Sequence, residues 1–185
     1  MLVAVIGSRA CSSKEAEIAL ELGELLAVHG CVVLSGLAKG IDTAALTGAV
    51  RSAGKAVAVL PTSRAEQVYP RGNQSLADAI KAAGGAVVTP FAKPRVDVSL
   101  LRQRLIERNF LMALYCDVAI VVSDSAQIAG GTAWMVAFCQ QLQRPIYRLN
   151  SAREMDCALL PVRRQVWWYP ELAELRRHIS CQPSS

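Results

Sequence analysis

Two glycine-rich turns near the start of the chain each follow an apolar stretch, and each carries one cation. The first is Gly7–Arg9, directly after Leu2–Ile6, and the second is Ser35–Asp42, after Cys31–Leu34. The planar guanidinium of Arg9 can pair with a phosphate through two hydrogen bonds, whereas Lys39 offers a mobile point charge. Glycine allows the backbone to approach an anion closely. These residue types indicate a site for a phosphate-bearing ligand.

A third turn of the same kind begins at Gly130 and Gly131 and ends at Thr132. At the start of the expected helix the backbone N–H groups are unpaired, the helix dipole is positive, and the threonine hydroxyl is placed to cap. A tight turn without a ligand explains any single glycine-rich loop about equally well, since short motifs often match by chance. Three such turns in one chain make a shared ligand site the better explanation.

Other polar residues near these turns have two readings each. Ser12 can bind the ligand or only cap the helix that follows it. Asp42 can hold Lys39 or a ligand hydroxyl, or only stabilise the start of a helix. Tyr69 can stack on a base or pack within its loop. Arg108 and Asn109 contribute only if their helix faces the site.

The predicted phosphate- or nucleic-acid-binding residues are therefore Gly7, Ser8, Arg9, Ser12, Ser35, Gly36, Lys39, Gly40, Asp42, Tyr69, Asn73, Arg108, Asn109, Gly130, Gly131 and Thr132. We expect no catalytic residue, no metal ion and no cofactor. Only His29 and His178 are histidines, and neither lies beside a motif, so histidine-based catalysis and metal binding are poorly supported.

The elements that must position these turns alternate between short apolar runs and longer segments with helical periodicity. This order predicts a Rossmann-like, doubly wound α/β fold, with a mostly parallel sheet flanked by helices in a single domain. All carboxyl ends of parallel strands meet at one sheet edge, so the three turns should converge there. The expected strands are 2–6, 31–34, 56–60, 86–88, 118–122 and 145–149, and the expected helices are 12–29, 41–53, 73–83, 100–115 and 132–143.

After residue 150 the pattern weakens. We expect a domain over residues 1–150 and an extension over 151–185 that packs on it. The extension is predicted to contain a helix near 151–160, an extended aromatic piece over 166–169, a short helix after Pro170 and frayed residues from 181 onward.

Composition fits one compact domain. The 185 residues are 52% hydrophobic, and 20 Lys and Arg against 15 Asp and Glu give a net charge of +5, which favours polyanionic partners. The six cysteines form no C-x-x-C pair, so reduced and mostly buried thiols are expected. No apolar run has the length of a membrane span or the pattern of a signal peptide, and we expect a cytoplasmic protein.

The motifs, taken in order, resemble the DNA-processing protein A (DprA/Smf) family over about residues 3–149. The resemblance rests on Gly7–Arg9 with Ser12, the eight residues Ser35–Asp42, Tyr69–Arg71 with Asn73, Arg108-Asn109 and the Gly130–Thr132 helix start. It implies an extended Rossmann-like domain that binds single-stranded DNA, forms a homodimer and helps to load a recombinase partner during natural transformation. It also implies that Arg9 and Lys39 contact the DNA backbone.

The sequence departs from that family at several positions. Leu46 stands where the family usually has histidine, Pro61 replaces a glycine, Ser123 replaces a glutamate, and the family's Phe-Pro-x-Arg-Asn-Arg reads Leu105–Phe110. More distantly, the chain is similar to the LOG-type phosphoribohydrolases. An enzyme of that type needs a glutamate on the helix after the Gly-Gly turn, near the developing oxocarbenium. The candidate positions here are Met135, Val136 and Ala137, so the carboxylate is missing.

The sequence therefore predicts a non-enzymatic, DprA-like protein that binds single-stranded DNA and acts in DNA uptake or recombination. A binding domain for a small nucleotide or nucleotide derivative is the first alternative. A LOG-like hydrolase of nucleoside monophosphates is the second.

Overall fold

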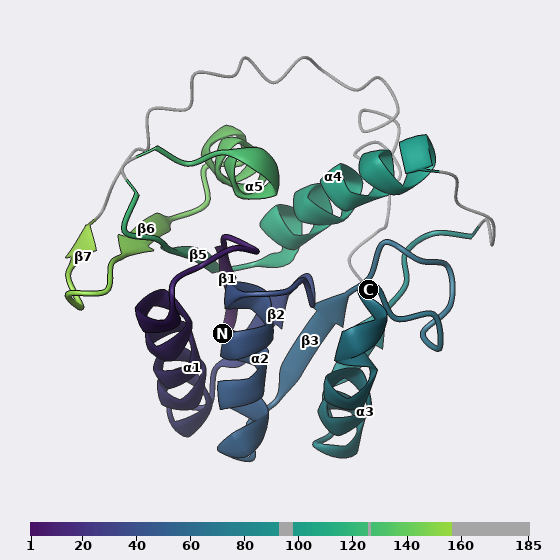
Figure 1. Cartoon of the computed structure of the whole chain (residues 1–185), viewed down its shortest axis with the longest axis horizontal. Helices are drawn as coiled ribbons and strands as arrows, with labels where there is room; N and C mark the ends of the chain where they lie inside the picture. The colour runs from purple at the N-terminus through teal and green to yellow at the C-terminus, as the bar shows by residue number, and fades with distance from the viewer. Residues whose placement is uncertain (93–97, 126, 157–185) are drawn as a thin grey trace, which may run out of the picture.

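The computed structural model describes residues 1–92, 98–125 and 127–156. The chain forms a seven-stranded sheet with helices on both faces (Figure 1). The strands are β1 (Leu2–Gly7), β2 (Val32–Ser35), β3 (Ala56–Val59), β4 (Ala86–Val88), β5 (Val118–Val122), β6 (Ile146–Leu149) and β7 (Met155–Asp156). The helices are α1 (Ser13–Val28), α2 (Ile41–Arg51), α3 (Gln74–Ala82), α4 (Val98–Tyr115) and α5 (Gly130–Gln141), and the 3-10 turn η1 (Arg71–Asn73) precedes α3.

The strand order is β4-β3-β2-β1-β5-β6-β7. From β1 to β4 the chain moves steadily toward one edge, and it then returns to place β5 on the other side of β1. The six strands from β1 to β6 pair in parallel, and β7 pairs antiparallel to β6. The predicted doubly wound α/β fold is confirmed. The order reverses between β1 and β5, where ligands bind in folds of this kind.

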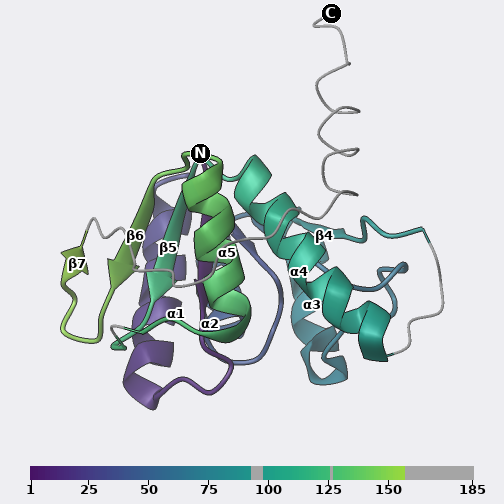
Figure 2. The same ribbon diagram turned by 90° about the horizontal axis from the view of Figure 1, so that it is seen from above.

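Helices α1, α2 and α3 cover one face of the sheet, and α4 and α5 cover the other (Figures 1 and 2). Successive side chains of β1 serve the two cores in turn, since Val3 and Val5 pack toward the first layer while Ala4 and Ile6 pack toward the second. In the second layer Phe110 of α4 meets Phe138 of α5 edge to face, with ring centroids 5.4 Å apart. This contact joins the two helices within the second core.

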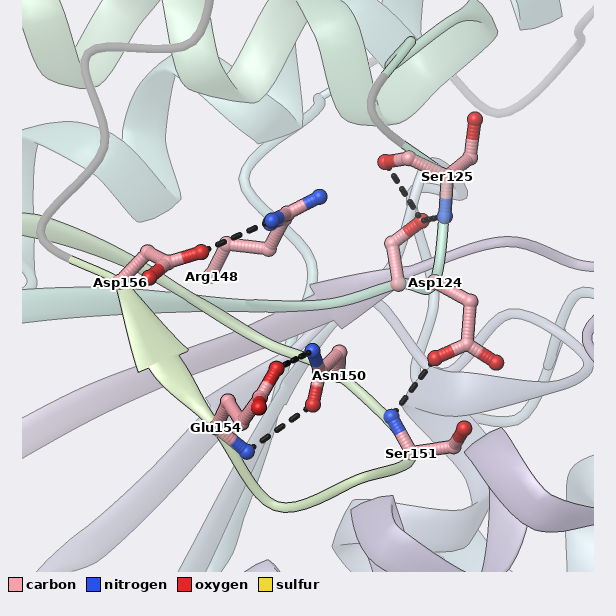
Figure 3. A network of polar contacts seen from close by, with 8 residues as sticks. Asp124, Ser125, Arg148, Asn150, Ser151, Glu154 and Asp156 are labelled. Atoms are coloured by element: carbon pink, nitrogen blue, oxygen red, sulfur yellow. Dashed lines mark hydrogen bonds and ion pairs between the residues drawn. The ribbon is translucent and has the colours of Figure 1, made fainter.

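The predicted strands and the first five predicted helices are confirmed, with bounds that shift by a few residues. The helix predicted near 151–160 is wrong over residues 151–156, where the chain turns back and adds β7 to the sheet edge (Figure 3). The turn is closed by Asn150, whose side chain bonds both the backbone N–H and the carboxylate of Glu154, and Arg148 pairs with Asp156 at 2.8 Å. These local polar contacts outweigh helical propensity over so short a segment.

The remaining predictions for the extension, over 157–185, lie outside the described residues, so the division at residue 150 stays a prediction. Cys116 and Cys139 are buried thiols, Cys11 and Cys31 are partly buried, and all four are free. Within the described ranges, no helix combines the length and the apolar character that crossing a membrane requires.

Candidate phosphate-binding site

A cavity of about 1170 Å³ opens at the carboxyl ends of β1 and β5, between α4, α5 and the turns that follow β1 and β2. Its position is the switch point of the sheet, as the strand order requires. The predicted residues that line it are Gly7, Ser8, Arg9, Asp42, Tyr69, Arg108, Asn109, Gly130, Gly131 and Thr132. The fold therefore brings together residues from all three glycine-rich turns.

The first two turns are in direct backbone contact. Ile41 donates its N–H to the carbonyl of Ser8 at 3.3 Å. Gly40 has φ +77°, and a Cβ atom there would lie 2.3 Å from the same carbonyl oxygen. Both the conformation and the close approach require glycine. Arg9 and Lys39 are consequently presented from adjoining turns, and both side chains are exposed.

The second turn is held from beneath by a buried acid and a buried base. Asp42 accepts the N–H groups of Gly36 and Ala38, each at 3.2 Å. Arg108 donates to the carbonyl of Gly36 and, at 3.2 Å, to that of Val59. A Cβ atom at Gly36 would lie 2.4 Å from the guanidinium carbon of Arg108, so the turn lies directly on this arginine. Of the two roles considered for Asp42, the structure shows the structural one: its carboxylate holds the turn that carries Lys39.

Burial perturbs both members of this pair. Loss of solvent raises the pKa of Asp42, an effect that the charge of Arg108 and the two backbone donors oppose. Burial lowers the pKa of Arg108 to about 10, against the stabilising charge of Asp42 and with a smaller contribution from nearby Arg9. Arg108 remains protonated at neutral pH. A fixed positive charge therefore lies under the cavity beside Arg9.

The third turn opens α5 as predicted, but its threonine does not cap the helix. The N-cap residue is Ala129, with no side-chain cap, and the Thr132 hydroxyl donates instead to the carbonyl of Gly7 at 2.9 Å. Asn109 donates to the carbonyl of Gly131 at 3.0 Å. The Gly7 carbonyl lies within reach of the Thr132 hydroxyl because β1 and β5 end side by side. Both bonds fix the start of α5, whose first N–H groups have no partner within the helix and lie at the cavity.

Four predicted residues with polar side chains lie outside the cavity lining. Lys39 is exposed beside it, and the other three have supporting contacts. Ser12 caps α1 in a reciprocal capping box with Glu15, which confirms its capping role. Ser35 is fully buried and donates to the carbonyl of Val5 at 2.7 Å, which joins β2 to β1. Asn73 donates to the carbonyl of Leu37 and to the hydroxyl of Thr43, both at 2.9 Å, which secures the second turn from the side of α3.

Sequence reasoning missed the wall that α4 contributes. Arg102 lines the cavity and is exposed, and Val98, Leu101 and Leu105 extend the same wall along the helix. The available signal was the spacing of Leu101 and Leu105, four residues apart, next to a cation. That pattern is also typical of an ordinary helix face packed on a core, and so it did not single out Arg102.

Three carboxylates also line the cavity, and each already accepts a backbone N–H group. Asp42 bonds the second turn, Glu15 bonds the N–H of Asp124 at 3.0 Å, and Asp124 bonds the N–H of Ser151 at 2.6 Å. Among the described residues, no group of three or more His, Cys, Asp or Glu side chains is arranged to hold a metal ion. The cavity thus presents exposed guanidinium groups and carboxylates that are engaged in structure.

The family model of DNA recombination-mediator protein A matches residues 1–159. The DNA processing protein DprA of Streptococcus pneumoniae is 45% identical over 78 residues, which is 42% of this chain and 27% of that protein. The chain spans only 27% to 35% of the length of the curated relatives that it matches.

Two solved structures extend the comparison. A structure of DNA processing protein A from Helicobacter pylori, described for its single-stranded DNA-binding mode, has a TM-score of 0.68 at 22% identity and covers 98% of this chain and 74% of its own. The molybdenum cofactor binding protein of Rippkaea orientalis has a TM-score of 0.60 at 26% identity and covers 97% of this chain and 96% of its own. At 22% identity the first likeness concerns the fold.

Proposed function

Because this chain belongs to the DNA recombination-mediator protein A family, we propose that it binds single-stranded DNA along the edge where β1, β2 and β5 end. The observation that carries the proposal is the convergence of three glycine-rich turns on one cavity with Arg9 exposed at its wall. Polyanions bind through phosphate contacts of this kind, made by cationic side chains and by free N–H groups at helix starts.

The proposed contacts differ in character. Arg9 pairs with one phosphate through its planar guanidinium, and Lys39 on the adjoining turn neutralises a neighbouring phosphate. The N–H groups at the start of α5 offer a third anchor. Arg102 approaches the strand from α4, which also lines the cavity. Tyr69, which is 37% exposed and lines the cavity, supplies an aromatic face on which a base can stack.

Binding without cleavage fits this site better than hydrolysis. On α5, the helix where a LOG-type enzyme would carry its glutamate, Met135 lines the cavity while Val136 and Ala137 are buried. The three carboxylates at the cavity each hold a backbone N–H group, and so none is positioned as an unengaged base. A hydrolase would release free base from a nucleoside monophosphate, which we expect this protein not to do.

A compact nucleotide-derived ligand is the second candidate. A cavity of about 1170 Å³ is large enough to enclose one, and the Rippkaea protein, which is named for binding the molybdenum cofactor, is matched over 96% of its length. In this alternative Arg9 and the start of α5 hold the phosphate of one small molecule.

The wider role in DNA uptake or recombination, the homodimer and the recombinase partner are also parts of the proposal. They are suggested by the family and concern whole proteins of which this chain spans about a third.

Salt dependence separates the two candidates. We would titrate fluorescein-labelled oligo-dT, and separately AMP, at several salt concentrations. A strand should give a slope of about −0.7 in log affinity against log salt for each phosphate neutralised, whereas AMP should give a shallow slope. Tight AMP binding together with a flat oligo-dT response would favour the small ligand.

Arg9→Ala tests the mapped site. Loss of a charge-assisted contact should weaken oligo-dT binding about tenfold to 100-fold, and should reduce the salt slope by about one phosphate. Arg51→Ala is the matched control, because Arg51 is exposed at the far end of α2, outside the cavity lining. Equal losses in the two variants would place the binding surface elsewhere.

A further inference from the structure

Glu15 is an unexpected residue in a cavity proposed to bind an anion, because this acidic residue lines the same cavity as Arg9. A negative charge at that position repels phosphate. Its contacts, however, span two of the loops that make the cavity. One oxygen accepts the N–H of Ser12 at 2.8 Å and the Ser12 hydroxyl at 2.9 Å, and the other accepts the N–H of Asp124 at 3.0 Å.

One partner follows the first glycine-rich turn and the other precedes the third. Ser12 lies three residues after Arg9, and Asp124 begins the loop that leads from β5 to the start of α5. The pairing of β1 with β5 already places the strand ends side by side, with Gly7 opposite Val122. Beyond that point the Thr132 hydroxyl joins the start of α5 to the Gly7 carbonyl, and the Glu15 carboxylate joins Ser12 to Asp124.

The link is anchored from outside the cavity. Asp124 accepts the N–H of Ser151 at 2.6 Å, and Ser151 begins the turn between β6 and β7 (Figure 3). Arg153 in the same turn pairs with Glu21 on α1 at 2.9 Å. The loop after β5 is therefore held between Glu15 on α1 and the hairpin turn.

The hydrogen bonds also account for the charge state. Burial alone would raise the pKa of Glu15, but the bonds from Asp124 and Ser12 outweigh it, and the pKa lies below its ordinary value. The carboxylate stays ionised, and the ionised form accepts all three bonds at once.

We infer that Glu15 is a positioning residue for the ligand site, which holds the Arg9 turn and the loop before α5 at the separation that one phosphate-bearing ligand requires. This inference rests on the proposed function. It assigns the ligand affinity of Arg9 in part to a residue whose own charge opposes binding.

Two substitutions separate the bridge from the charge. Glu15→Gln removes the negative charge, but one acceptor becomes an NH₂ group that cannot accept from Ser12 or from Asp124. If Glu15 acted only as a local charge, this variant would bind oligo-dT more tightly. If Glu15 acts as a bridge, the Glu15→Gln variant should bind oligo-dT at least about fivefold more weakly than the unmodified chain. Glu15→Asp keeps the charge and shortens the reach, and so it should also weaken binding.

Glu17→Gln is the matched control, since Glu17 is an exposed carboxylate on the same helix and lies outside the cavity lining. It should bind at least as tightly as the unmodified chain. In a double-substitution cycle, Glu15→Gln should cost much less when Arg9 is already alanine, because a residue that acts through Arg9 has nothing left to position. A merely structural loss would be the same in both backgrounds.

The outcomes are distinct. Weaker binding by both Glu15 variants, together with non-additivity with Arg9→Ala, supports the inference. Tighter or unchanged binding by Glu15→Gln, unchanged binding by Glu15→Asp, or full additivity overturns it while the proposed function stands. If the unmodified chain does not bind oligo-dT, the proposed function fails. If it binds oligo-dT without any effect of Arg9→Ala, the mapped site is wrong. In either case the inference fails with it.

Discussion

The buried pair of Arg108 and Asp42 gives the sharpest test of how the site is built. Arg108→Met keeps a long apolar side chain on α4 but removes the donors to the carbonyls of Gly36 and Val59. Asp42 would then lie in a nearly inaccessible position, 7% exposed, without its compensating cation. The two groups interact through their charges and through the turn that both contact, rather than as one of the direct ion pairs of the described residues. Leaving a buried charge uncompensated costs up to about 3–5 kcal/mol.

The two lost charge-assisted hydrogen bonds, at roughly 1.5–3 kcal/mol each, are consistent with that range, since the two estimates describe overlapping effects. Urea unfolding at pH 7 measures the change, with Arg102→Met as the control. Arg102 lies on the same helix and carries the same charge, but it is exposed, and its replacement should change the free energy of unfolding by less than about 0.5 kcal/mol.

The pH dependence of the free energy of unfolding provides an independent test of this coupling. The folded-state pKa of Asp42 is already raised above its ordinary value of 3.8, and loss of Arg108 should raise it further. Because the folded chain then binds a proton that the unfolded chain has released, stability falls as pH rises from 3.8 through the raised pKa. Arg108→Met should therefore recover stability relative to the unmodified chain when the pH is lowered below neutral.

Neutralising Asp42 should rescue part of the loss. In the Arg108→Met, Asp42→Asn double variant, the amide oxygen still accepts from the turn but leaves no buried charge. The double variant should be more stable than Arg108→Met alone. Destabilisation of Arg108→Met by less than about 1 kcal/mol, or no rescue by Asp42→Asn, would refute the reasoning, because the pair would then not be coupled.

Two further predictions concern the turns and the hairpin. Gly40→Ala forces a side chain into a positive-φ position 2.3 Å from the Ser8 carbonyl oxygen, so it should destabilise the chain by more than about 1 kcal/mol in thermal unfolding and weaken oligo-dT binding in titration. Gly72→Ala is the control, because a Cβ atom there meets no atom within 4 Å, and it should change neither quantity. Arg153→Ala breaks an ion pair whose side chains are 69% and 36% exposed, and thermal unfolding should register a loss below about 1 kcal/mol that vanishes in high salt.

Much of the fold could be predicted because its signals are local. The apolar β-branched runs and the glycine stops between them identified every strand from β1 to β6 and every helix from α1 to α5. The hairpin after Leu149 was missed because β7 is two residues long and depends on pairing with β6, and no pattern within residues 151–156 shows that partner.

The three turns are a property of the sequence itself, since each consists of glycine and small polar residues in one short segment after an apolar run. Parallel topology then requires them to meet at one edge, and that requirement could be stated without any coordinates. Which side chains face the cavity could not be predicted from the sequence. Arg108 is 72 residues from Gly36, Thr132 is 125 residues from Gly7, and Asp124 is 109 residues from Glu15.

In each of these contacts a polar group bonds a partner that the packed sheet brings close. For the buried Arg108, a missing partner would cost more than a bond gains. Tertiary structure thus made Arg108, Ser35 and Asn73 supports of the turns, and it added Arg102 and Glu15 to the cavity wall. The sequence by itself determined that three glycine-rich turns exist and share one edge. Only the packing of helices on the sheet decided which cations reach the cavity, because side-chain direction depends on neighbours that are remote in the chain.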